Sequence, residues 1–86
     1  MIQIGEAANT YNPALNLLTQ KGYSIRAVIL DDEKFIWEAT YRNIKISAHD
    51  PLTLLGLANL AETYGEQWQE YSNNLYDQFL DKSLEK

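Results

Sequence analysis

The chain contains no cysteine and no long hydrophobic run. Disulfide bonds, thiolate metal sites and a cysteine nucleophile are therefore excluded. Small secreted domains usually depend on disulfides, so the missing cysteine favours a cytoplasmic location. No window approaches the roughly 18 apolar residues of a membrane-spanning helix. The N-terminal stretch MIQIGEAANTY has neither a basic region nor a long apolar segment, so we expect no signal peptide.

Glycine and histidine are too sparse to build common active sites. The four glycines are scattered, whereas phosphate-binding loops need glycines close together. His49 is the only histidine, and a general base there is one hypothesis. We interpret it instead as a residue preceding a helix cap. The acidic cluster at 31–33 is interpreted as a solvated hairpin turn. The sequence thus predicts no enzyme, no metal and no cofactor.

Basic residues are scarce in the C-terminal part of the chain. Residues 50–86 contain seven acids but only Lys82 and Lys86, whereas residues 1–49 are balanced, so the net charge of −5 arises after residue 49. Such a surface repels nucleic acids and anionic membranes. It attracts a basic protein partner, although modest negative charge also serves solubility alone.

The residues that are present predict one small domain, 1–86, that begins with a helix. Six Tyr, two Trp and two Phe supply large buried areas for a thin core. Apolar residues with helical spacing and the Asn12-Pro13 pair predict a helix from Pro13 to about Gln20, with Asn12 as N-cap and a looser lead-in from Glu6. Gly22 stands where a left-handed C-terminal cap is needed.

Three strands are predicted next, at residues 23–30, 34–40 and 43–48. The first places Ile25, Ala27 and Ile29 on one face, and the third places Ile44 and Ile46 inward. The connections are short, DDEK and then Tyr41-Arg42-Asn43, so the strands form an antiparallel meander.

A second helix is predicted to begin at Asp50-Pro51, with Asp50 as N-cap. Gly56 is expected to allow close approach to the sheet, and Leu54 to widen the apolar face. That face is formed by Leu52, Leu55, Leu57, Leu60, Ala61 and Tyr64.

Residues 51–82 form either one helix or two. A single helix through Gly65 loses only about 1 kcal/mol relative to alanine, but it is very long for so small a domain. We therefore favour a break at Gly65 and a last helix from about Glu66 to Leu80. The predicted fold is α+β, in the order α-β-β-β-α-α, with the meander packed against helices on one face.

The most distinctive feature is an acidic series, Glu62, Glu66 and Glu70, at four-residue spacing. On one helix, like charges at that spacing repel each other. We interpret the series as a docking face for a basic protein, while the alternative is a solvated helix face beside core aromatics. The candidate anchors are Trp68, Tyr64 and Tyr71, and a second candidate surface is the open face of the sheet around Trp37.

The element order resembles that of the double-stranded RNA-binding domain. That domain has a basic cluster where its second helix begins, but the corresponding HDPLTLLG stretch has no Lys or Arg, so the resemblance carries no RNA-binding residues over. The segments QKGY, FIWEA, DPLTLLGL and YGEQW are similar to those of small acidic bacterial proteins of unassigned function, including immunity-protein-like ones. That resemblance implies a toxin-neutralising role.

The leading prediction is a non-catalytic cytoplasmic protein-binding module, an immunity or inhibitor protein in its most specific form. The alternative is a structural homodimer or complex subunit whose C-terminal aromatic helix packs on a neighbour. A small enzyme built around His49 is the third hypothesis.

Overall fold

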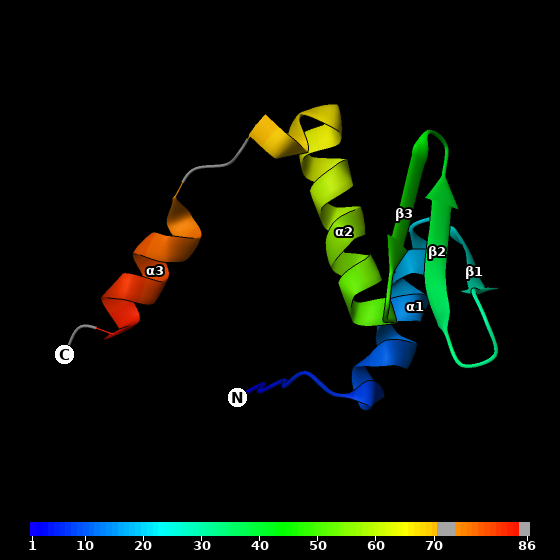
Figure 1. Ribbon diagram of the computed structural model, residues 1–86, viewed down its shortest axis with the longest axis horizontal. Coiled ribbons are helices and arrows are strands. Elements are labelled where there is room, and N and C mark those ends of the chain that lie inside the picture. The colour runs from blue at the N-terminus through cyan, green and yellow to red at the C-terminus, as the bar shows by residue number, and fades with distance from the viewer. Residues whose placement is uncertain (71–73, 85–86) are drawn as a thin grey trace.

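The computed structural model describes residues 1–70 and 74–84 and confirms the α+β fold (Figure 1). The elements in chain order are η1 (Ala8–Thr10), α1 (Tyr11–Gln20), β1 (Ser24–Ile29), β2 (Phe35–Tyr41), β3 (Ile44–Ala48), α2 (Pro51–Tyr64), η2 (Gly65–Glu70) and α3 (Leu75–Leu84). The sheet is an antiparallel meander with the strand order β1-β2-β3. Within this described part, no helix is long and apolar enough to cross a membrane.

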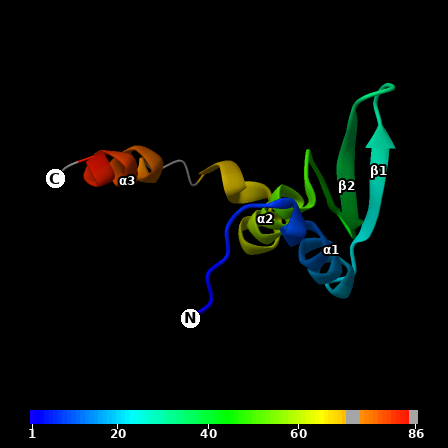
Figure 2. The same cartoon turned by 90° about the horizontal axis from the view of Figure 1, so that it is seen from below.

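α1 and α2 lie side by side on one face of the sheet (Figure 2). The core between these two layers is small. It consists of Leu18, Tyr23, Ala39, Leu54 and Ala58, each at most 5% exposed. The opposite face of the sheet carries a polar row in which Glu38 pairs with Arg26 at 3.0 Å and with Lys45 at 3.8 Å.

The first helix begins earlier than predicted. It begins at Tyr11, and Thr10 rather than Asn12 is the capping residue, although Thr10 makes no side-chain cap hydrogen bond. Pro13 fits inside the first turn because the amides there have no intrahelical partner. The predicted lead-in from Glu6 is reduced to the single 3-10 turn η1.

The end of α1 is capped as predicted. Gly22 has φ +101°. The Gly22 amide donates to the Thr19 carbonyl at 3.0 Å, and the Tyr23 amide donates to the Leu18 carbonyl at 3.1 Å. This pattern is a Schellman motif, and its usual apolar contact is supplied by Leu18 and Tyr23, which share the core.

The strands keep the predicted alternation with small shifts at their ends. Tyr41 belongs to β2 and pairs with Ile44, so the connection to β3 is only two residues long. Arg42, with φ +53°, supplies the positive dihedral that such tight hairpins need. On β1, Ile25 packs against the core, but Ile29 is 78% exposed because the helices do not reach the end of the β1–β2 hairpin.

α2 confirms its predicted cap but not its predicted buried face. The Asp50 carboxylate accepts a 2.8 Å hydrogen bond from the Thr53 amide, and Pro51 occupies the first turn. Leu54 and Ala58 form the centre of the buried face, whereas Leu60 is 44% exposed. The buried face of α2 points at α1 as well as at the sheet, which shifts it away from the predicted stripe.

The glycines of α2 behave differently from one another. Gly56 was expected to allow close approach, but a Cβ there would meet nothing within 4 Å. Gly65 ends the helix with φ +63°, as predicted. The predicted last helix from Glu66 to Leu80 is wrong: a 3-10 segment, η2, follows Gly65, and the last α-helix is Leu75–Leu84.

Candidate functional site

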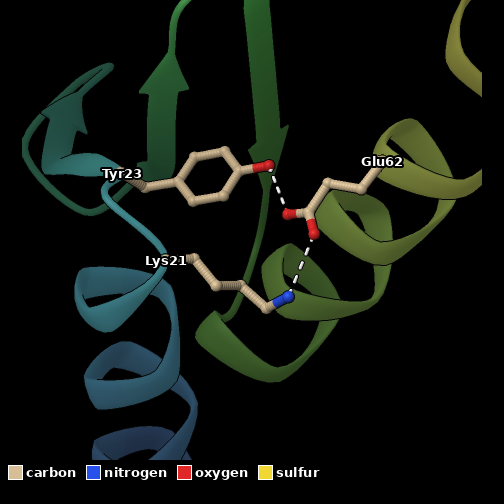
Figure 3. Close-up of polar contacts among 3 residues, drawn as sticks. All are labelled: Lys21, Tyr23 and Glu62. Carbon is tan, nitrogen blue, oxygen red and sulfur yellow. Dashed lines mark hydrogen bonds and ion pairs between the residues drawn. The ribbon is translucent and has the colours of Figure 1, made fainter.

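A polar cluster joins the end of α1 to the last turns of α2 (Figure 3). The Schellman turn places Lys21 and Tyr23 beside Glu62 of α2. The Lys21 ammonium lies 3.0 Å from Glu62 Oε1, and the Tyr23 hydroxyl donates to Glu62 Oε2 at 2.8 Å. Both carboxylate oxygens are therefore used inside the protein.

The cluster is arranged for structure and not for acid–base chemistry. The hydrogen bond from Lys21, followed by the one from Tyr23, holds the pKa of the Glu62 carboxyl below its ordinary value. Burial, followed by the hydrogen bond to Glu62, raises the pKa of Tyr23 to about 12. Glu62 thus stays ionised and Tyr23 stays protonated near neutral pH, whereas a general acid or base needs a pKa close to the working pH.

Glu62 consequently does not act in one acidic edge with Glu66 and Glu70. Gly65 ends the α-helix between them, and Glu66 and Glu70 lie on η2, where the four-residue spacing of an α-helix does not apply. The acidic face predicted for a continuous helix is reduced to the two exposed carboxylates of η2.

Replacing Glu62 by glutamine is expected to destabilise the protein in a pH-dependent way. A carboxyl whose pKa is lowered by folding contributes stability above its unfolded value, near 4.5, and that contribution is lost as the pH falls through the lower folded value. The loss at pH 7 should be about 0.5–1.5 kcal/mol, because the pair is partly solvated.

Urea unfolding at pH 7 and below pH 4 measures this effect. The two proteins should differ at pH 7 and converge in acid. Glu66→Gln is the matched control, since Glu66 is exposed on η2 and its change should stay within about 0.5 kcal/mol. If Glu62→Gln lowered the free energy of unfolding equally at both pH values, the contribution of Glu62 would come from packing and not from its charge.

The second feature is an open groove of about 490 Å³, here called the β3–η2 groove. One wall is the free edge of the sheet at residues 43–47. The floor and other wall come from α2 and η2, through Leu57, Leu60, Ala61, Gly65, Glu66 and Trp68. Trp68 is 52% exposed and Leu60 is 44% exposed, so large apolar side chains face solvent here.

The groove lies where α2 packs beside β3, the last strand of the sheet. In the part of the chain that the structure describes (1–70 and 74–84), β3 pairs with a strand on one side only, so its other edge is a free strand edge there. The α-helix ends at Gly65, and Trp68 of the following η2 lines the groove. Of the predicted site residues, the structure therefore brings Glu66 and Trp68 together.

The other predicted anchors lie elsewhere. Trp37 packs against the core, edge-on to Phe35 at 6.0 Å between ring centroids, and so lies on the helix-covered face and not on the open one. Tyr64 is 36% exposed at the end of α2. Tyr71 lies outside the described residues, and the remaining aromatics of the predicted last helix are split between η2 and α3.

Two parts of these sites escape sequence reasoning. Lys21 and Tyr23 lie about forty residues from Glu62, and only the QKGY cap hints that they are held in place. The sequence of β3 predicts an ordinary alternating strand. No residue pattern within it indicates that another strand does not pair with its second edge.

His49 and the acidic turn agree with their structural interpretations. His49 is exposed one residue before the α2 cap. In the turn, the Asp31 carboxylate accepts from the Glu33 amide at 3.0 Å. Among residues 1–70 and 74–84, no three His, Cys, Asp or Glu side chains are grouped to hold a metal ion.

Comparison with known protein families, with curated proteins and with solved structures found no match. No relative therefore lends this chain a function. The resemblances to RNA-binding domains and immunity proteins stay predictions.

Proposed function

We propose that the chain is a non-catalytic protein-binding module that receives a partner in the β3–η2 groove. The observation that carries the proposal is the exposure of Trp68 and Leu60 in a groove bounded by a free strand edge. Tryptophan is enriched among the residues that dominate binding energy, and apolar grooves favour burial of a partner's side chains.

The charge around the groove favours a basic partner. Glu66 lines the groove and Glu70 follows on the same 3-10 segment. Together with the acidic C-terminal part of the chain, they attract positive charge and accelerate association at low salt. Neutralisation of a toxin in the cytoplasm is the specific form of this function that the resemblance to immunity proteins suggests.

Binding should depend on both the tryptophan and the carboxylates, but in different ways. Proteins captured from the source cell's lysate and identified by mass spectrometry would be purified and titrated against variants. Trp68→Ala should weaken binding by roughly 30-fold or more at any salt concentration. Glu66→Gln/Glu70→Gln should weaken it by about tenfold at low salt and little at high salt.

The matched control is Asp31→Asn/Asp32→Asn, which removes the same two charges from the β1–β2 turn. If both double variants weakened partner binding equally, Glu66 and Glu70 would act only through the net charge of the protein. A partner bound unchanged by Trp68→Ala would place the docking site outside the groove.

A homodimeric structural subunit is the second candidate function. It is favoured by α3, whose apolar side chains are exposed and which lies apart from the body of the protein (Figure 1).

A further inference from the structure

α3 is an amphipathic helix whose apolar face is uncovered. Its five large apolar residues range from 47% exposed at Leu75 to 81% exposed at Tyr76. At about 100° per residue they form one continuous face. A ten-residue helix is marginal in water without a surface to pack on. α3 therefore needs an apolar surface that the other described residues do not provide in this arrangement.

The β3–η2 groove matches α3 in length and chemistry. A ten-residue helix is about 15 Å long, and the five-residue strand that forms one wall is about 17 Å long. The α2 side of the groove offers Leu57 and Leu60, and the η2 side offers Trp68. Groove and helix each expose apolar side chains, and docking would cover both sets together.

The charges flanking the two surfaces also correspond. On α3, Asp77 and Asp81 border one edge of the apolar face and Lys82 borders the other. The groove carries Glu66 on its η2 wall, whereas Lys45 of the β3 wall pairs with Glu38 on the opposite face of the sheet. Lys82 therefore pairs with Glu66 when its edge of α3 faces η2. Reversing a helix in a groove exchanges its two edges, so opposite charges meet in only one of the two possible directions.

The direction of the chain favours a second copy over the chain's own α3. In both views α2 lies between α3 and the sheet (Figures 1 and 2). The groove opens at β3, on the sheet side of α2. To reach its own groove, α3 would have to pass to the other side of α2. A neighbouring molecule's groove requires no such reversal.

We infer that two copies of this chain form a reciprocal dimer in which the α3 helix of each copy lies in the β3–η2 groove of the other. This inference rests on the proposed function of the groove as a docking site. In the homodimer, the segment that fills the groove is α3 of the second copy. Phe79 and Leu80 of one copy then contact the Leu57 and Leu60 region of its partner.

Cysteine cross-linking tests the arrangement directly, because the natural chain has no cysteine. Leu60→Cys and Phe79→Cys proteins are purified separately, one of them isotopically labelled, then mixed and oxidised mildly. A mixed disulfide between labelled and unlabelled chains is the expected main product. Gln78→Cys, on the polar side of the same helix, is the matched partner for Leu60→Cys and should give at least fivefold less of the mixed product.

The double variant Leu60→Cys/Phe79→Cys separates the two possible connections. Disulfide-linked dimers support the inference. A disulfide formed only within one chain overturns the inference, because α3 then folds back on its own groove. In the mixing experiment, equal cross-linking of Leu60→Cys to Phe79→Cys and to Gln78→Cys overturns it as well.

Sedimentation equilibrium supplies the test on chains without cysteine. The natural chain should have twice its 9.9 kDa mass, and Phe79→Asp should return it to a folded monomer, because α3 is outside the core. Its thermal transition should no longer depend on protein concentration. A natural chain that stays monomeric at all concentrations overturns the inference. Partner capture repeated with Phe79→Asp, whose groove is intact and no longer filled by α3, separates this result from the proposed function: capture is kept or increased when only dimerisation is lost.

Discussion

Replacing Leu18 by alanine is expected to lower the free energy of unfolding by about 2–5 kcal/mol. Leu18 is fully buried, and it packs in the core with Tyr23 and Leu54. Removing its side chain leaves a cavity between α1, α2 and the sheet that so few core residues cannot refill. Small domains are stable by only about 5–15 kcal/mol. The midpoint of thermal unfolding of the variant should therefore fall to about 37 °C.

The neighbouring Leu17→Ala is the matched control, since it removes the same atoms from the same helix. Leu17 is 46% exposed, so its loss should be below about 1 kcal/mol. Urea unfolding followed by far-UV circular dichroism measures both. Similar losses in the two variants would contradict the assignment of the α1 buried face to Leu18.

Gly22→Ala is expected to destabilise the protein by about 2–4 kcal/mol. Gly22 has φ +101°, where a side chain is strained. A Cβ there would also lie 2.8 Å from Cε1 of Tyr41. The Tyr41 ring is held by Tyr23, at 5.4 Å between ring centroids, and by the Arg42 guanidinium, 5.0 Å from the ring centroid. The ring cannot move away without disturbing the core at Tyr23.

Two other glycines separate backbone strain from crowding. Gly65→Ala meets nothing within 4 Å but has φ +63° and ψ −142°, a region that favours glycine, so strain of about 1–3 kcal/mol without crowding is expected. Gly56→Ala, inside α2 with open space around it, should stabilise the protein by about 0.5–1 kcal/mol. Thermal unfolding should thus rank the variants with Gly56→Ala above the natural protein and Gly22→Ala lowest. A Gly22→Ala protein no less stable than Gly65→Ala would contradict the Tyr41 contact.

Local chemistry accounts for the features that could be predicted from the sequence. Asp50-Pro51 starts α2 and Gly22 and Gly65 end helices, because caps and left-handed residues act through backbone groups only a few positions away. The alternation and short turns of residues 23–48 likewise specify the meander. The first helix start was misplaced at Asn12 because Pro13 is tolerated anywhere in the first turn.

The functional surfaces depend on long-range contacts that residue spacing does not encode. Spacing alone predicts a broad apolar face on α2 that includes Leu60 and leaves out Ala58. Packing against α1 and the sheet instead buries Leu54 and Ala58 and leaves Leu60 at the groove. Glu62 looked like part of an acidic series until the cap of α1 placed Lys21 and Tyr23 against it.

The sequence by itself therefore determined the order of the elements up to Gly65, the cap at Asp50 and the helix ends at Gly22 and Gly65, and that the C-terminal part is acidic. Only the tertiary structure decided which apolar side chains stay exposed and which carboxylate is used internally. The physical reason is that caps, turns and alternation are satisfied within a few residues, whereas burial and ion pairing depend on which elements meet. At the open edge of β3 and on α3, the described elements leave apolar surface uncovered.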